Sequence, residues 1–415
     1  SFSQFGGKKG IGSEHMLVCM IDRILKMLDT PEGRALVIRS QYDWSGAFDR
    51  QDPTKTVNKF ILMGIRSSLI PVLIDFLSGR SMKLKFNGKE AGPWPLVGGS
   101  PQGSYLGQTA YTTGCHDNTQ QLDIQEEDKF QYIDDLDLLE FIILTDVLIE
   151  YNFRAHVASD IGIGQRFLPP SSTKTQSYHE GISVWTQENL QKLNSDKSKY
   201  ILHTRSKEVF ATRFTLDGCL IDKETSTKVL GVWIGEDPSS WDINTRQIIK
   251  RTYANMSILT KLKYAGLSRT KLLHIYSLHV RSSMEYCSVV WHDNLTQAQS
   301  NAIERLQIVS LKIILGSDCP FKEDGHFDYS KALSICKLNT LFSRREKRAL
   351  DFGKKCIQHP TLKKLFPTNP ATFLNPHVRN REPFQVNRAR TASYNSSSIP
   401  AIQRRLNKHY KYSPL

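Results

Sequence analysis

Three carboxylates in this 415-residue chain have the type and spacing to bind divalent cations. Asp134 and Asp135 are adjacent and lie between two short apolar runs, a pattern typical of two strands joined by a tight turn. Asp43 follows a second strand-like run at residues 34–42. Adjacent carboxylates repel each other, and a bound cation removes that repulsion. The alternative for Asp134 and Asp135 alone is an acidic surface turn, because Asp is common in turns.

Two strands must converge if these carboxylates are to share metal ions. We therefore expect the strand that ends before Asp43 to lie beside the hairpin that carries Asp134. Around them the sequence predicts a helix over residues 53–63, a hairpin that turns at residues 87–88, and a helix over residues 140–151.

Composition limits the class of protein. The length and the 39% hydrophobic content predict two or three folded domains, and no run of eighteen apolar residues predicts a membrane span. Seven scattered cysteines without a Cys-x-x-Cys pair indicate reduced thiols in an intracellular protein, nuclear or cytoplasmic. Cys319 with His326 does not have the spacing of a zinc finger. The chain opens at Ser1 rather than Met, so we expect it to lack an amino-terminal part.

The net charge of +14 is unevenly distributed. Residues 241–415 contain 29 Lys and Arg against 11 Asp and Glu, or +18, whereas residues 1–240 carry −4. This asymmetry predicts a polyphosphate partner held by the basic part while metals act in the other part. A merely soluble cationic surface is the alternative.

Two glycine-rich segments could contact such a partner. Residues 4–13 combine glycines with Lys8 and Lys9, and we expect a basic loop that touches nucleic-acid phosphates, with an ordinary helix-capping loop as the alternative. Residues 98–107 contain glycines that let backbone approach a ligand, and the Gln102 amide can bond a sugar or a base edge.

The order of these motifs resembles that of the reverse transcriptase of LINE-type non-LTR retrotransposons, across nearly the whole chain. The matching segments are residues 4–10, 43–49, 101–104, 132–135, 193–198 and 228–231. Gly46 departs from the family's usual Lys, and Ile133 departs from its usual Ala.

The resemblance implies an α+β fold, the right-hand polymerase palm, in which an antiparallel sheet packs on helices. It implies partial fingers and palm over residues 1–235, a helical thumb over residues 236–316, and a basic, partly irregular extension over residues 317–415. We also predict that Tyr253, Tyr264 and Tyr276 belong to the core of the thumb rather than to a stacking surface.

The implied activity is RNA-directed DNA polymerisation, in which two Mg²⁺ ions, replaceable by Mn²⁺, assist transfer of a nucleotide from a dNTP to a primer 3′-hydroxyl. Asp43 and Asp134 are expected to bridge the ions, with Asp135 in support. Lys197 is expected to act near the pyrophosphate, and Lys199 competes for that role.

The resemblance also implies contacts with sugar, template and primer. Phe48 would reject a 2′-hydroxyl by steric exclusion, although it could simply be a core residue. Gln102 and Gly103 are expected to position the dNTP. The residues expected to contact the RNA template and the DNA primer are Lys8, Lys9, Leu230, Gly231, Lys250, Arg251, Lys261 and Lys263. The alternatives are an RNA-templated RNA polymerase and a catalytically inactive remnant that only binds nucleic acid.

Overall fold

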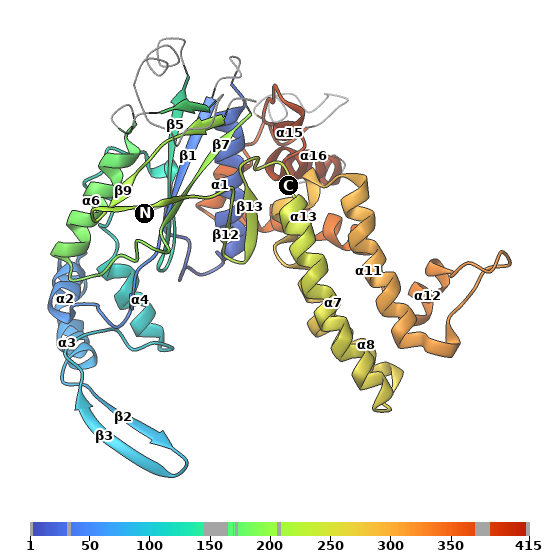
Figure 1. Ribbon diagram of the computed structural model, residues 1–415, viewed down its shortest axis with the longest axis horizontal. Helices are drawn as coiled ribbons and strands as arrows, with labels where there is room; N and C mark the ends of the chain where they lie inside the picture. Colours follow the sequence, from blue (N-terminus) through green and yellow to red (C-terminus); the bar gives the residue numbers. More distant parts are fainter. Residues whose placement is uncertain are drawn as a thin grey trace. The chain divides into compact units, whose positions relative to one another are not determined.

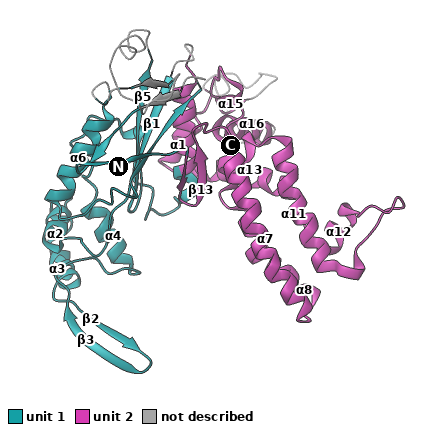
Figure 2. Ribbon diagram, viewed as in Figure 1, with its two compact units in different colours: residues 1–16, 32–225 teal, residues 17–31, 226–415 magenta. Residues whose placement is uncertain are grey.

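The computed structural model describes residues 3–30, 35–144, 165–168, 170, 173–205, 209–369 and 382–411. It has a mixed α/β fold, and the chain divides into two compact units (Figure 2). The first unit comprises residues 1–16 and 32–225, and the second comprises residues 17–31 and 226–415. Within the part of the chain that is described, none of the helices combines the length and the apolar character needed to cross a membrane.

A five-stranded sheet forms the centre of the first unit (Figure 1). Its strands, in spatial order, are β11 (Asp222–Lys223), β7 (Lys199–Thr204), β1 (Ala35–Tyr42), β5 (Asp135–Ile143) and β4 (Lys129–Tyr132). β1 is antiparallel to both neighbours, β5 and β7. Seven of its eight residues are buried, because both faces of this central strand are covered. The strand-like run that precedes Asp43 in the sequence is therefore the central strand of the sheet.

Helices and short strands complete the first unit. The helices are α2 (Pro53–Leu62), α3 (Ile70–Leu77), α4 (Tyr105–Gly114) and α6 (Thr175–Glu188), with the 3₁₀ turns η1 (Ser67–Leu69) and η2 (Glu126–Asp128). The small strands are β6 (Gln165–Phe167), β8 (Val209–Ala211), β9 (Thr215–Leu216) and β10 (Cys219–Leu220). Tyr111 of α4 and Ile182 of α6 join side chains of the sheet in one apolar cluster, so both helices pack on the sheet.

A two-stranded hairpin, β2 (Ser81–Phe86) and β3 (Lys89–Pro95), extends from the first unit. It turns at Asn87 and Gly88, whose φ angles are 47° and 75°, as the Asn-Gly signal predicts. Every residue of both strands is exposed. Exposed large side chains include Met82, Leu84 and Phe86.

The second unit is largely helical and contains most of α1 (Ser13–Leu28) and one hairpin, β12 (Ser226–Val229) with β13 (Val232–Gly235). Its other helical segments are α7 (Asp242–Tyr264), α8 (Arg269–Ile275), η4 (Tyr276–Val280), α9 (Arg281–Glu285), α10 (Ser288–Trp291), η5 (His292–Asn294), α11 (Gln297–Leu315), η6 (Gly316–Asp318), α12 (Tyr329–Cys336), α13 (Leu341–Gln358), η7 (Leu362–Leu365), α15 (Ala392–Asn395) and α16 (Ser398–Tyr410). Thr296 starts α11 with a capping box.

Two predictions about these elements are wrong. The helix expected over residues 140–151 begins inside β5, which continues to Ile143, and residues 145–151 lie outside the described part. Tyr276 is buried, as predicted, but Tyr253 and Tyr264 are 53% and 88% exposed rather than core residues. The buried positions of α7 include Ile248 and Thr252, and Tyr253 is one position beyond that stripe, so its side chain points about 100° away.

Candidate active site

The carboxylates expected to share metal ions come from neighbouring strands. β1 pairs with β5 so that Tyr42 lies opposite Leu136. Asp43 therefore leaves β1 beside the turn that precedes β5. Asp134 lies in that turn, and Asp135 is the first residue of β5, opposite Tyr132 of β4. The register of one strand pair thus brings together segments ninety-one positions apart in the chain.

The electrostatics of the cluster disfavour ionised carboxylates. Burial raises the pKa of Asp43, and the charge of Asp134 raises it further, while Lys197 and Asn194 lower it. Burial, followed by the charges of Asp134, Asp137 and Asp43, raises the pKa of Asp135 to about 7. Burial is the largest cause of both raised pKa values, and repulsion from the neighbouring carboxylates adds to it.

Carboxylates are the donors that magnesium prefers, but the oxygens of Asp43, Asp134 and Asp135 do not all lie within 4.8 Å of one another. Mg²⁺ prefers hard oxygen ligands and keeps several water molecules, so two or three carboxylates are enough. The Asp43 side chain is 40% exposed and Asp134 is exposed, so hydrated ions and a substrate can reach both. A dication would offset the repulsion that raises the pKa of Asp135.

Lys197 is held beside Asp43 by backbone contacts. The N–H of Asn194 donates to the carbonyl of Asp43 at 2.9 Å, which docks the 194–197 turn at the end of β1. Lys197 Nζ lies 3.9 Å from Asp43 Oδ2, and its side chain is 70% exposed. Lys199, in contrast, lies in β7 and forms an ion pair with Glu224. Of the two candidate lysines, Lys197 is therefore the one beside the carboxylates.

Phe48 lies in an aromatic pair near the same cluster. Its ring stacks on Tyr111 with centroids 4.3 Å apart and an interplanar angle of 22°. Burial raises the pKa of Tyr111 well above its ordinary value, and Cys115 and the charges of Asp134 and Asp135 raise it further. Phe48 itself is half-buried, so part of its ring remains accessible.

The glycine-rich loop docks on the turn that follows Asp43. The N–H of Ser100 donates to the Phe48 carbonyl at 2.8 Å. Gln102 Nε2 lies 3.5 Å from Asp49 Oδ1, and Gln102 is exposed. Gly103 is also exposed and has a φ of 80°, a backbone conformation that favours glycine. Gln102 and Gly103 are thus exposed on a loop that is fixed to the Asp43 segment.

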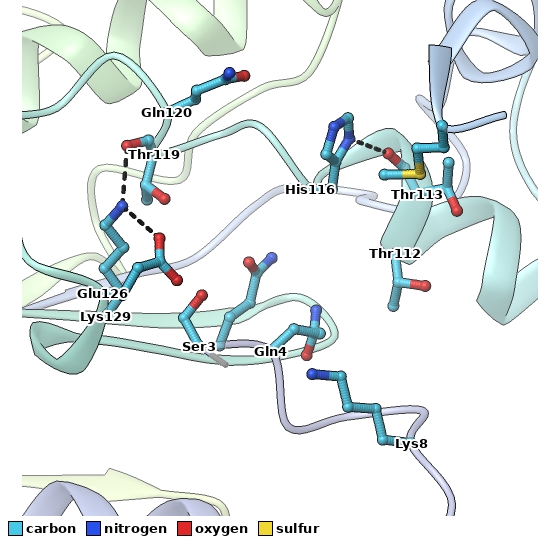
Figure 3. Close-up of a pocket in the computed structure, with 12 residues that line it drawn as sticks. Ser3, Gln4, Lys8, Thr112, Thr113, His116, Thr119, Gln120, Glu126 and Lys129 are labelled. Carbon is cyan, nitrogen blue, oxygen red and sulfur yellow. Dashed lines mark hydrogen bonds and ion pairs between the residues drawn. The ribbon is translucent and has the colours of Figure 1, made fainter. Parts of the chain in front are cut away.

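Lys8 and Lys9 differ in their surroundings. Lys9 is exposed, whereas Lys8 is half-buried and burial lowers its pKa. Lys8 lines a cavity of about 310 Å³ (Figure 3). The figure shows Lys8 and Gln4 on one side of this cavity and Thr112 of α4 on another.

In the second unit, Leu230 and Gly231 form the turn of the β12–β13 hairpin. Their φ angles are 44° and 88°, which is typical of a two-residue turn with both residues left-handed. The Tyr286 hydroxyl donates to the Leu230 carbonyl at 2.8 Å, and a Cβ at Gly231 would lie 3.0 Å from the Tyr286 ring. The Leu230–Gly231 turn is therefore fixed from outside by a tyrosine.

The four basic residues of α7 that were expected to contact nucleic acid fall into two kinds. Arg251 donates to the Ser283 carbonyl at 2.8 Å, and Lys263 donates to the Ile313 carbonyl. Lys250 and Lys261 are exposed. Two of the four are thus already bonded within the unit.

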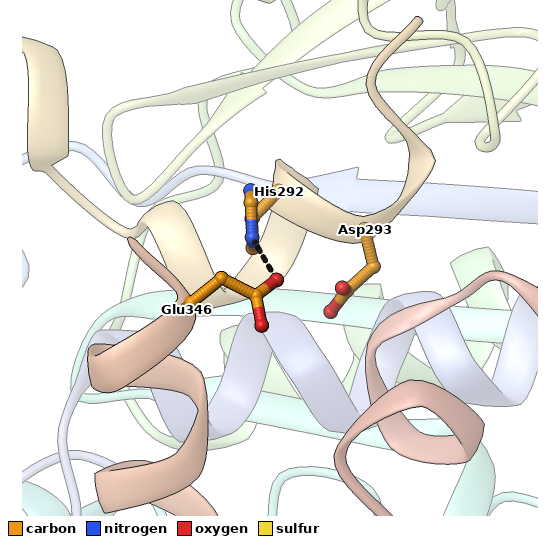
Figure 4. Close-up of side chains that lie close together, drawn as sticks. All are labelled: His292, Asp293 and Glu346. Carbon is orange, nitrogen blue, oxygen red and sulfur yellow. Dashed lines mark hydrogen bonds and ion pairs between the residues drawn. The ribbon is translucent and has the colours of Figure 1, made fainter. Parts of the chain in front are cut away.

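A cluster that sequence reasoning missed joins His292, Asp293 and Glu346 in the second unit (Figure 4). Among the described residues, it is the one group of three potential metal ligands whose ligand atoms all lie within 4.8 Å of one another. Arg405 Nε donates to Glu346 Oε2 at 2.9 Å and Arg405 Nη2 forms an ion pair with Asp293 at 2.5 Å. His292 Nε2 lies 2.8 Å from Glu346 Oε1, and Arg345 Nε donates to His292 Nδ1 at 3.2 Å.

Two arginines contact the three side chains of this cluster. Both nitrogens of His292 are already bonded, and Arg405 neutralises both carboxylates. The hydrogen bonds from His292 and Arg405 hold the pKa of Glu346 well below its usual range. The three side chains are therefore held by ion pairs and hydrogen bonds to two arginines, although Asp293 Oδ2 is buried without a hydrogen-bond partner. We interpret the cluster as an ion-pair network rather than as a metal site. The sequence analysis did not find this cluster, because no motif connects His292 with Glu346, which is 54 positions away.

Comparisons with known proteins give little further information. No protein-family model matches the sequence, and no curated protein matches it. Among solved structures, the chain is similar to a telomerase from Candida tropicalis in complex with the TWJ fragment of telomeric RNA, with a TM-score of 0.37 and 11% identity. The match covers 83% of this chain and 51% of the telomerase chain, so it spans about half of that protein. A TM-score of this size does not establish a shared fold.

Proposed function

We propose that the chain is a reverse transcriptase of the LINE type, which transfers nucleotides from dNTPs to a primer 3′-hydroxyl on an RNA template. The observation that carries the proposal is the adjacency of Asp43, at the end of β1, and Asp134, in the turn before β5. The six motifs in chain order support the same function. In this proposal the five-stranded sheet is the palm of a right-hand polymerase, and α7 belongs to the thumb.

Five residues of the first unit have defined roles in the proposed reaction. Asp43 and Asp134 would hold two Mg²⁺ ions, with Asp135 in support. Ions bound there stabilise charge on the attacking and leaving oxygens of the nucleotidyl transfer. Lys197, held beside Asp43, offers positive charge to the departing pyrophosphate. Phe48 lies where a ring would exclude a ribose 2′-hydroxyl.

Nucleic acid is the proposed partner of the exposed basic residues. Lys250 and Lys261 of α7 are exposed and available for phosphate contacts, which position a duplex without reading its sequence. Arg251 and Lys263 would first have to release the carbonyls that they bond. We therefore assign the larger part of the salt dependence of binding to Lys250 and Lys261.

Primer extension on an RNA template with Mg²⁺ tests the proposal. We expect the intact chain to extend the primer with dNTPs and Asp134→Asn to lower the rate by on the order of 10²–10⁴-fold, because a metal ligand is lost without a change of shape. Asp123→Asn is the matched control, because the Asp123 side chain is 83% exposed and pairs with Lys174. It should leave the rate unchanged.

Three outcomes contradict the proposal in different ways. Extension that survives Asp134→Asn refutes the metal assignment. Faster incorporation of ribonucleotides than of deoxynucleotides indicates an RNA polymerase instead. No extension by the intact chain, together with salt-sensitive binding of RNA, favours an inactive nucleic-acid binder, a function that the +18 charge of residues 241–415 would also serve.

A further inference from the structure

The turn that carries Asp134 contains a backbone conformation that needs support. β4 ends at Tyr132 and β5 begins at Asp135, so Ile133 and Asp134 alone connect the strands. Ile133 has a φ of 62°, in the left-handed region. That region is unfavourable for a β-branched residue, and such residues persist only where surrounding contacts hold them. The position of the Asp134 carboxylate therefore depends on whatever holds Ile133.

Two glutamine side chains bind both backbone groups of Ile133. Gln4 Oε1 accepts the N–H of Ile133 at 3.2 Å and also the N–H of Gly6 at 2.9 Å. Gln131 Nε2 donates to the carbonyl of Ile133 at 3.1 Å. Gln131 belongs to β4, but Gln4 is 129 positions away from Ile133, so the amino-terminal segment contributes half of this support.

The amino-terminal segment is built into the edge of the sheet. Gln4 forms a parallel bridge with Gln131, and the Phe5 N–H donates to the Gln131 carbonyl at 2.7 Å. The Phe5 ring stacks on Phe130 with centroids 6.1 Å apart. The segment therefore continues the sheet beyond β4 and has little freedom to move independently of the turn.

Glycine at position 6 is required by this arrangement. A Cβ there would lie 2.6 Å from Ile133 Cγ1 and 2.8 Å from the Ile133 backbone nitrogen. Such contacts are too short to exist without a shift of the turn. The backbone of Gly6 thus packs directly on Ile133, and Gln4 is brought within hydrogen-bond distance by the same close approach.

We propose that Gln4 is a positioning residue for the reaction proposed above, because it fixes Ile133 and thereby the Asp134 carboxylate. It touches neither substrate nor metal in this role and acts only through the turn. Gln4 also lines the 310 Å³ cavity of Figure 3, so its side chain is not enclosed on all sides and its two accepted hydrogen bonds hold it in place. The inference rests on the proposed polymerase function, but the contact itself can be measured without it.

Three variants test the inference. Gln4→Met keeps the length of the side chain and removes the acceptor, whereas Gln4→Glu keeps an acceptor oxygen for both N–H groups. Gln121→Met is the matched control, because Gln121 Nε2 also bonds a backbone carbonyl, that of Gly181, elsewhere in the same unit. Hydrogen exchange of the peptide that covers residues 129–136 measures the turn directly, and steady-state primer extension measures the reaction.

We expect Gln4→Met to speed exchange of the Ile133 amide at least about tenfold, since its acceptor is lost. We expect kcat to fall about tenfold to a hundredfold, because small misplacement of a reacting group has effects of this size, while KM for the dNTP changes less than about twofold. Gln4→Glu should restore most of both values, and Gln121→Met should change neither.

Unchanged exchange in Gln4→Met would show that Gln4 does not hold the turn. Faster exchange with an unchanged kcat would show that the turn is held but that its position does not matter for the rate, which also overturns the inference. A loss of kcat that Gln4→Glu does not restore would indicate general misfolding rather than the lost acceptor. If the intact chain extends no primer, the proposed function fails and the catalytic role of Gln4 fails with it, while the exchange result still decides whether the contact exists.

Discussion

Replacing Glu346 with glutamine distinguishes an ion-pair network from a metal site in the second unit. Glu346 accepts from Arg405 Nε at 2.9 Å, forms a second contact with Arg405 Nη2, and lies 2.8 Å from His292 Nε2. Glu346→Gln keeps the shape and one acceptor oxygen but removes the negative charge. Arg405 then keeps only Asp293 as an anionic partner in the cluster.

The expected cost follows from exposure and from the number of contacts. A hydrogen bond to a charged group contributes about 1.5–3 kcal/mol. The Glu346 side chain is 36% exposed, so solvent screens part of its interaction with Arg405. We therefore expect a loss of about 2 kcal/mol, which lowers Tm by roughly 4–8 °C for a unit of this size.

The effect should also depend on pH. The folded-state pKa of Glu346 lies below its ordinary value, so the folded state binds fewer protons than the unfolded state does. The contribution of Glu346 is therefore complete above about pH 4.5 and is lost as the pH falls below that value. Thermal unfolding of the intact chain from pH 3.5 to pH 7.5 should show this loss, and Glu346→Gln should reduce it.

Two further measurements complete the assay. Glu323→Gln is the control, because Glu323 is an exposed glutamate in the same unit, and it should change Tm by less than about 2 °C. Neither zinc nor EDTA should shift the Tm of the intact chain through this cluster. A ligand present at a hundred times its Kd would add about 2.7 kcal/mol. A rise in Tm with zinc that disappears in Glu346→Gln would refute the network and establish a metal site.

The remaining predictions concern a buried acid and the aromatic pair. Burial raises the pKa of Asp22 to about 7. The stabilisation that protonated Asp22 contributes is therefore complete below about pH 4 and is lost as the pH rises through about 7. This loss in the free energy of unfolding is at most on the order of 4 kcal/mol. Asp22→Asn should therefore flatten the fall in Tm between pH 4 and pH 8, and a fall as steep as that of the unchanged chain would contradict this assignment. Phe48→Ala should raise the ratio of ribonucleotide to deoxynucleotide kcat/KM at least about tenfold, or about 1.4 kcal/mol, and Phe48→Tyr should not. An unchanged sugar preference would show that Phe48 is only a core residue stacked on Tyr111.

Local patterns were sufficient to predict some elements. The Asn87–Gly88 turn depends on neighbouring residues only, and it has the expected geometry. The apolar run from residue 138 to 144 is ambiguous, because a short apolar run fits a buried strand as well as a helix. Pairing with β1 resolves that ambiguity in favour of β5.

The supporting contacts of the site could not be predicted in the same way. The motif around Gln4 suggested a phosphate-binding loop, but the bond from Ile133 to Gln4 exists only because the amino-terminal segment runs along β4. The left-handed φ of Ile133 is also imposed by tertiary contacts, since isoleucine has no local preference for it. Residue type and order suggested which carboxylates could act, whereas their orientation depends on distant segments.

The β2–β3 hairpin has a practical consequence for work with the purified protein. It is a two-stranded sheet whose outer edges pair with no other strand in the described residues, and it presents Met82, Leu84, Phe86 and Trp94 to solvent. Open strand edges and grouped apolar side chains favour self-association. Concentrated samples should therefore aggregate through the β2–β3 hairpin. Replacing Leu84 with a charged residue would be the first change to make for solubility.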